Sequence, residues 1–153
     1  MTPGTGEEAG PDTARATGAA LAVGLRASVR AIVTEDDTAL AMGSGDVPVL
    51  ATPRLLALAE AAAIAAIAPY LAETSTSVGT SASLEHKRAS PLNEELEVEA
   101  ELTEVDGARL VFSFIARVWN PAEDLVVGAG SMERVVVDRK RFVAHARPAS
   151  VGA

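Results

Sequence analysis

The sequence has no cysteine, few aromatic residues and a deficit of positive charge. Without cysteine, the chain has no disulfide, no thiolate metal ligand and no cysteine nucleophile. Aromatic residues make up 3% of the chain, so the core must consist of Ala, Val, Leu and Ile. The net charge is −8, from 21 acidic and 13 basic residues. This balance argues against general nucleic-acid binding, which requires Lys and Arg to displace counterions, but a few local cations suffice for one phosphate-bearing ligand.

No segment of the sequence has the pattern of a membrane span or a signal peptide. The longest apolar run, residues 61–68, is closed by Pro69 and is shorter than the roughly 20 residues that cross a bilayer. Residues 1–11 include Glu7 and Glu8 and lack the basic start of a signal peptide. We therefore expect a soluble, cytoplasmic protein without membrane contact.

The 153 residues fit one domain of ordinary size. Residues 1–20 are rich in Gly, Pro, Thr and Ala and are predicted to form a disordered leader, because they cannot bury enough apolar surface to offset the entropy lost on ordering. Residues 146–153 are predicted to form a flexible tail. The folded domain is expected at residues 21–145.

Alternating polar and apolar residues predict an antiparallel sheet. Acidic and apolar residues alternate over residues 94–105, as is typical of a strand with one face in water. Asp106 and Gly107 predict the hairpin turn that follows, and Gly128 and Gly130 indicate a bulge or a close backbone approach. The expected strands are residues 25–33, 38–42, 78–89, 94–105, 109–119 and 125–137, of which the first two form a pair.

One long helix is predicted between Thr52 and Pro69. Thr52 is a good N-cap residue, and Pro53 suits the first helical position. Ala and Leu dominate the segment and no side of it is polar, which predicts a buried helix. A sheet of five to six strands must then curve around this helix. The prediction is the hot-dog fold, of the α+β class, in a homodimer in which the helix and the sheet edge face a second copy.

Glu60 is the only charged residue between positions 55 and 71, within the predicted helix. Because an unpaired buried carboxylate is strongly destabilising, Glu60 must have a partner or a function. A structural explanation is that Glu60 reaches solvent through a gap in the sheet, or pairs with Arg54 or with another chain. The alternative is that Glu60 is catalytic.

His86 and Thr52 are the other two candidates. His86 shares its strand face with Ala82 and Leu84, so it is either a hydrogen-bonded core histidine or a catalytic one. Helix capping alone would explain Thr52. Thr52 lies about 12 Å from Glu60 along the helix axis, so the two are expected to cooperate only across a cleft or a dimer interface.

Other patterns point to no metal and no separate cofactor. Two separated histidines without cysteine lack metal-ligand spacing, and the sequence has no G-x-S-x-G elbow, P-loop or dinucleotide-binding motif. The basic run of Arg139, Lys140 and Arg141 is either a surface patch or a contact for ligand phosphates.

Three stretches together resemble the fluoroacetyl-CoA thioesterase family of hot-dog proteins. They are "VLAT" followed by "LAEAAAIAAIAPYL", then "SVGTSASLEHKRASP", and "VVGAGSMERVVVDRKRF". The likeness covers roughly residues 22–143 and includes the spacing from Thr52 to Glu60 to His86. It implies that these three residues form a catalytic group at the dimer interface, completed by Gly79. It also implies an apolar lid with a Phe at the position of Asp46, in a loop that here has no aromatic residue.

The resemblance implies hydrolysis of a small acyl-CoA thioester to free acid and CoA, with coenzyme A as part of the substrate. His86 would move protons near neutral pH, Glu60 would act as base or nucleophile, and Thr52 would attack the thioester or hold water. A backbone N–H near Gly79 would stabilise the oxyanion. One alternative is a non-catalytic acyl-CoA or small-ligand binding protein. A hydratase is ranked last, because that chemistry typically places its His on the helix or the loop before it.

Overall fold

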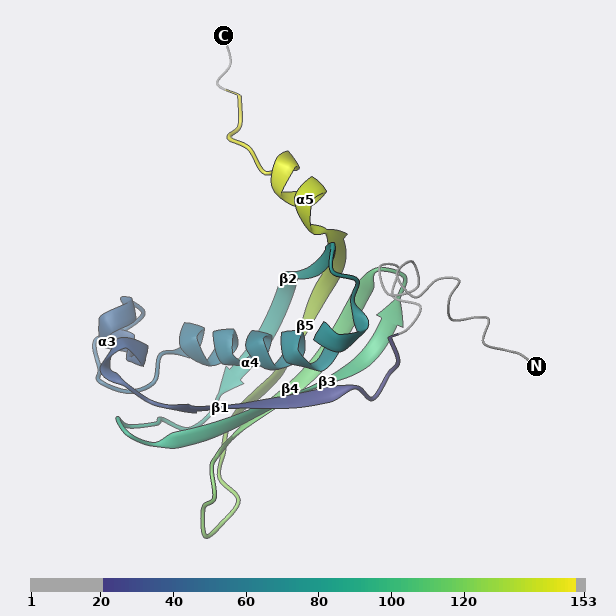
Figure 1. Cartoon of the computed structure of the whole chain (residues 1–153). Helices are drawn as coiled ribbons and strands as arrows, with labels where there is room; N and C mark the ends of the chain where they lie inside the picture. Colours follow the sequence, from purple (N-terminus) through teal and green to yellow (C-terminus); the bar gives the residue numbers. More distant parts are fainter. Residues whose placement is uncertain (1–20, 151–153) are drawn as a thin grey trace, which may run out of the picture.

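The computed structural model describes residues 21–150. Five antiparallel strands form one curved sheet in the order β1-β3-β4-β5-β2, and helix α4 lies against one face of it (Figure 1). This is the predicted α+β arrangement, with five strands. The elements are β1 (Arg26–Ile32), η1 (Glu35–Asp37), α3 (Ala39–Met42), α4 (Thr52–Ile67), η2 (Ala68–Tyr70), β2 (Ser75–His86), β3 (Glu95–Asp106), β4 (Arg109–Val118), β5 (Val126–Asp138) and α5 (Arg139–His145).

Strands β3 and β4 form the hairpin that the alternating pattern predicts. The apolar side chains of β3 are buried, and the Glu side chains between them are partly exposed on the other face. Gly107 adopts a φ of 62° at the turn, a conformation that glycine reaches without steric cost. The local pattern is therefore sufficient to define both strands and the turn.

Strands β5 and β2 approach each other closely at Gly128 and Gly130. A Cβ atom on Gly128 would lie 2.7 Å from the carbonyl oxygen of Glu85, and one on Gly130 would collide with the carbonyl oxygen of Ser83. The prediction of a close backbone approach is confirmed. The approach brings His86 opposite Gly128 in the register.

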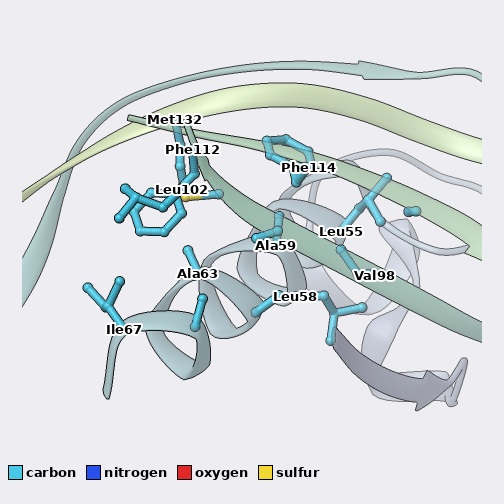
Figure 2. Close-up of a cluster of buried hydrophobic side chains, with 14 of the residues drawn as sticks. Leu55, Leu58, Ala59, Ala63, Ile67, Val98, Leu102, Phe112, Phe114 and Met132 are labelled. Carbon is cyan, nitrogen blue, oxygen red and sulfur yellow. The ribbon is translucent and has the colours of Figure 1, made fainter. Parts of the chain in front are cut away.

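Helix α4 supplies the centre of the core, but only one side of it is covered. Figure 2 shows its buried side chains against those of the sheet, namely Leu55, Leu58, Ala59, Ala63 and Ile67 against Val98, Leu102, Phe112, Phe114 and Met132. On the opposite side Ile64 is 46% exposed. The prediction of a helix buried on all sides is wrong for a single chain, because one five-stranded sheet covers one side of the helix.

The segment Thr52–Tyr70 is long and apolar enough, by length and composition alone, to cross a membrane. A core helix passes the same test. In this structure the segment is the central helix and the short η2 turn that follows it.

The chain between β1 and α4 differs from the prediction. Residues 39–42 form helix α3 rather than a strand, and Thr38 caps it by accepting a hydrogen bond from the Ala41 N–H at 3.1 Å. Strand β1 pairs with β3 instead, with Arg26 opposite Glu101. The five residues 38–42 are too short for their periodicity to separate helix from strand, and the capping hydroxyl favours the helix.

The C-terminal end also differs from the prediction. Helix α5 follows β5 directly and projects away from the sheet (Figure 1). Asp138 caps it, accepting a hydrogen bond from the Arg141 N–H at 2.9 Å. None of its seven residues is buried. The predicted leader, residues 1–20, lies outside the described residues, as do positions 151–153 of the predicted tail.

Candidate active site

Thr52 is the first residue of α4 rather than its N-cap. Ala51 occupies the N-cap position and provides no side-chain hydrogen bond. The Thr52 hydroxyl instead shares a 2.8 Å hydrogen bond with Nδ1 of His86. The predicted capping role is therefore wrong, and the hydroxyl connects the start of α4 to the end of β2.

The imidazole of His86 is half-buried at the end of β2. Its Nε2 atom is buried and has no hydrogen-bond partner within residues 21–150. Burial lowers the pKa of His86 below its ordinary value of 6.5, although the nearby backbone of Arg88 opposes the shift. His86 is therefore neutral at pH 7 and able to accept a proton.

Thr52 and His86 line a cavity of about 360 Å³ between the end of β2 and the loop after α3. Asp46 lies on the wall of the same cavity. The side chain of Arg88, also on this wall, is held by Glu94 at 2.7 Å. The hydroxyl and the imidazole thus face a space large enough for a small ligand group.

Glu60 lies further along α4 than Thr52 and is paired with Arg134 of β5. Arg134 Nη1 lies 3.0 Å from Glu60 Oε2, and the Glu60 side chain is 40% exposed. The pairing with Arg54 that the sequence left open is wrong, because the partner of Glu60 within residues 21–150 is Arg134. Arg54 contacts Asp37 at 2.9 Å.

Arg134 is a residue that the sequence reasoning missed. It is only 5% exposed, and it also donates to the side-chain and carbonyl oxygens of Ser77 at 2.8 and 3.0 Å. The signal was present in β5, where Arg134 alternates with Met132 and Val136 on the buried face. A cation on an inward strand face requires a carboxylate, and Glu60 is the carboxylate on the facing helix.

Gly79 of β2 completes this second group. A Cβ atom on Gly79 would lie 2.6 Å from Glu60 Oε2 and 3.4 Å from Arg134 Nη1. Glycine at this position therefore leaves the space in which the carboxylate lies against the strand. Gly79 and Glu60 therefore lie next to each other within one chain.

The predicted site residues thus form two separate groups within one chain. Thr52 and His86 are hydrogen-bonded to each other at one cavity, whereas Glu60 is paired with Arg134 beside Gly79. In the described part of the chain, no hydrogen bond joins Glu60 to either member of the first group. This agrees with the expectation that Thr52 and Glu60 do not meet within one chain.

The chain and its fold resemble a known class of protein. A family model described as the fluoroacetyl-CoA-specific thioesterase matches residues 33–140. The fluoroacetyl-CoA thioesterase of Streptantibioticus cattleyicolor is 34% identical over 99 residues, which cover 65% of this chain and 68% of that protein.

Solved structures give the same result. A fluoroacetyl-CoA thioesterase has a TM-score of 0.74 at 29% identity, over 84% of this chain and 98% of that chain. A point mutant of such an enzyme, in complex with fluoroacetate and CoA, has a TM-score of 0.72 at 30% identity, over 80% and 99% of the two chains. A thioesterase superfamily member from Thermus thermophilus, with a TM-score of 0.73 at 23% identity over 81% and 89%, shares the fold.

The fold is therefore the hot-dog fold of the thioesterases. Within that class, the chain belongs to the fluoroacetyl-CoA-specific thioesterase family, whose members are thioester hydrolases.

Proposed function

We propose that the chain hydrolyses the thioester of a small acyl-CoA to the free acid and CoA. The observation that carries the proposal is the Thr52–His86 hydrogen bond at the wall of a 360 Å³ cavity, in a member of this family. A hydroxyl bonded to a neutral imidazole is an arrangement that activates an oxygen nucleophile for attack on a carbonyl carbon. The relative with bound fluoroacetate and CoA supports a CoA thioester as the ligand class.

Two chemical routes fit this pair of residues. In the first, His86 accepts the Thr52 proton, the Thr52 oxygen bonds to the acyl carbon, and the C–S bond breaks as the CoA thiolate leaves and takes the proton. Water then hydrolyses the acyl-Thr ester. In the second, His86 and Thr52 hold a water molecule, which loses a proton to His86 and bonds to the acyl carbon; the C–S bond then breaks, and the CoA thiolate leaves and takes the proton from His86. Both routes give one acid and one free thiol.

Glu60 enters the site from the second copy in this proposal. Strand β2 lies at the edge of the sheet formed by residues 21–150, and the neighbouring side of α4 exposes Ile64. An antiparallel second β2 would extend the sheet and cover this side in a twofold dimer. We place the partner's Glu60 beside the buried, unpartnered Nε2 of His86, where a carboxylate would orient the ring or activate water.

Gly79 would act together with Glu60 in this dimer. Its missing Cβ leaves room for the carboxylate, and a backbone N–H at this position is the proposed donor to the oxyanion of the transition state. The two groups of site residues would then become one site, with each chain supplying half.

Asp46 bears on the choice of acyl group. It lies on the wall of the cavity, and its carboxylate stands where the family resemblance implies an apolar Phe lid. Because a charged residue does not favour an apolar C–F group, we propose a small acyl-CoA without selection for fluoroacetyl-CoA.

The test is release of free thiol from a panel of short-chain acyl-CoAs. We expect Glu60→Gln and His86→Ala to lower kcat by about a hundredfold or more, whereas the matched variant Glu97→Gln, on the other face of the sheet, keeps full activity. Full activity in both site variants would show that the site is assigned to the wrong residues. CoA binding without thiol release from any substrate would identify a non-catalytic binding protein instead.

A further inference from the structure

Within residues 21–150, the Lys and Arg side chains without an ion pair lie in α5 and just after it, at Arg147. Every Lys and Arg from Arg26 to Arg134 has a carboxylate within 4.0 Å. By contrast, Arg139, Lys140 and Arg141 form no ion pair with any residue from 21 to 150. Arg139 donates one N–H to the carbonyl oxygen of Ser75 at 3.3 Å. Three positive charges therefore occupy consecutive positions of a helix without a buried residue, in a protein of net charge −8.

We infer that α5 binds the phosphate groups of CoA at the active site of the partner subunit. The inference rests on the proposed function and its dimer. CoA carries a pyrophosphate and a 3′-phosphate at the far end of its pantetheine arm. The inference assigns a binding site to these groups, which the proposed function leaves without one. An acidic protein repels such an anion unless local cations receive it.

The position of α5 excludes the active site of its own chain. Strand β2 separates Ser75, next to α5, from His86 by 11 residues, or roughly 36 Å at 3.3 Å per residue. Figure 1 shows α5 and α3, whose following loop lines the cavity, at different ends of the molecule. An intramolecular contact between α5 and the ligand of this cavity would require a ligand that spans the whole strand.

The proposed dimer brings α5 to the other cavity. If Gly79 lies opposite the partner's His86 in antiparallel β2 strands, Ser75, four residues earlier, lies past the end of the partner's β2, on the side where the partner's chain continues to Ser90. Asp138 is opposite Ser75 on β5, and α5 begins at the next residue. Ala89, adjacent to Ser90, lines the cavity of its own chain. Helix α5 of one protomer therefore lies at the mouth of the other protomer's cavity.

The chemistry of α5 suits phosphate. An Arg guanidinium presents several N–H donors in a planar fork, and a Lys ammonium adds a mobile point charge. Beside Arg139 is a hollow of about 310 Å³, lined by Ser75, Thr76 and Ser77 with Ile64 and Glu73. Its mixed polar and apolar wall is suited to an amide-bearing arm, and Glu73 is the one carboxylate among the lining residues. The hollow itself has one cation, Arg139, and Lys140 and Arg141 follow it on α5, beyond the capping carboxylate of Asp138.

The binding test uses the double variant Lys140→Gln/Arg141→Gln, which leaves the Arg139–Ser75 contact in place. Calorimetric titration with free CoA is expected to show affinity weaker by about tenfold, with dephospho-CoA less affected and pantetheine unaffected. The matched control, Arg26→Gln/Arg117→Gln, removes the same charge from exposed ion pairs and should retain the affinity for CoA. Equal CoA affinity in wild type and Lys140→Gln/Arg141→Gln would overturn the inference, as would an equal loss for pantetheine.

A mixing experiment tests whether α5 acts on the partner subunit. In a mixed dimer of Lys140→Gln/Arg141→Gln with His86→Ala, one site combines an intact His86 from the first chain with an intact α5 from the second. When the two variants are refolded together, we expect that site to turn over substrate with the wild-type KM. Neither variant alone should show turnover with this KM. Absence of restored turnover at low substrate would overturn the action across subunits. If no acyl-CoA is hydrolysed but CoA affinity still depends on α5, only the proposed hydrolysis fails.

Discussion

The guanidinium of Arg134 contacts the carboxylate of Glu60 at 3.0 Å, and the two groups differ sharply in exposure. Arg134 is 5% exposed and Glu60 is 40% exposed. The buried cation also donates two hydrogen bonds to Ser77 of β2. Arg134 thus joins β5, β2 and α4, and it holds the Glu60 carboxylate against Gly79.

Replacing Arg134 should reduce both stability and turnover. Arg134→Gln removes three charge-assisted hydrogen bonds and leaves the polar oxygens of Ser77 without their donor, so we expect the free energy of unfolding to fall by about 2 kcal/mol. Urea unfolding measures this loss. Because Glu60 also loses its orientation, kcat for thiol release should fall more than KM changes, and Arg134→Lys should recover part of it.

The exposed Arg109–Glu133 pair offers a control on the same strand β5 and its neighbour β4. Arg109→Gln should change the urea midpoint little, because exposed ion pairs contribute little to stability. An Arg134→Gln protein as stable and as active as wild type would contradict the positioning role.

Thr52 is expected to matter for chemistry and not for the start of α4. Thr52→Ala removes the hydroxyl that bonds to His86 but no capping bond, so kcat should fall at least about tenfold with an unchanged melting temperature. Thr52→Ser should keep activity. Mass spectrometry of quenched reactions separates the two routes, since an acyl group on Thr52 appears only in the first. A loss of stability equal to that of a missing cap would show that the predicted capping role was correct after all.

The lowered pKa of His86 predicts the acid limb of the pH profile. Burial lowers the pKa below 6.5, so the midpoint at which kcat/KM declines with acidification should lie below pH 6.5. Measurement of kcat/KM between about pH 5 and 8 checks this, and an NMR titration of the His86 ring assigns it. A midpoint above 6.5 would contradict the effect of burial.

The same shift makes His86 a source of acid sensitivity. Because the folded pKa is lower than the unfolded one, the unfolded chain binds more protons at pH values between the two. The free energy of unfolding should therefore fall as the pH drops from 6.5 through the folded pKa. His86→Ala should remove this part of the pH dependence in urea titrations.

Gly79→Ala should impair turnover through Glu60. The new Cβ would lie 2.6 Å from Glu60 Oε2, the flexible end of a side chain, so the carboxylate must move while the strand remains intact. We expect kcat to fall about tenfold with little loss of stability. A double-mutant cycle with Glu60→Gln checks the mechanism. If Gly79→Ala has its full effect without the Glu60 carboxylate, displacement of that group is not the cause.

Much of the fold could be predicted because its determinants are local. Acidic and apolar residues alternate along β3, and Gly107 follows Asp106 at the turn. The helix is bounded by Pro53 and Pro69. Each of these features depends on neighbours in the chain, so periodicity and turn chemistry define it without knowledge of the rest of the molecule. Residues 38–42 are too few to show a periodic pattern, and there the capping hydroxyl of Thr38 favours a helix.

The sequence by itself identified Thr52, Glu60 and His86 as the candidates for the chemistry and placed them on one helix and one strand. Only the tertiary structure decided their partners. Thr52 bonds to a residue 34 positions away, and Glu60 pairs with Arg134, 74 positions away. Such contacts depend on how α4, β2 and β5 pack. A buried cation pairs with the carboxylate that this packing brings within contact distance. That physical dependence divides the site into two groups within one chain.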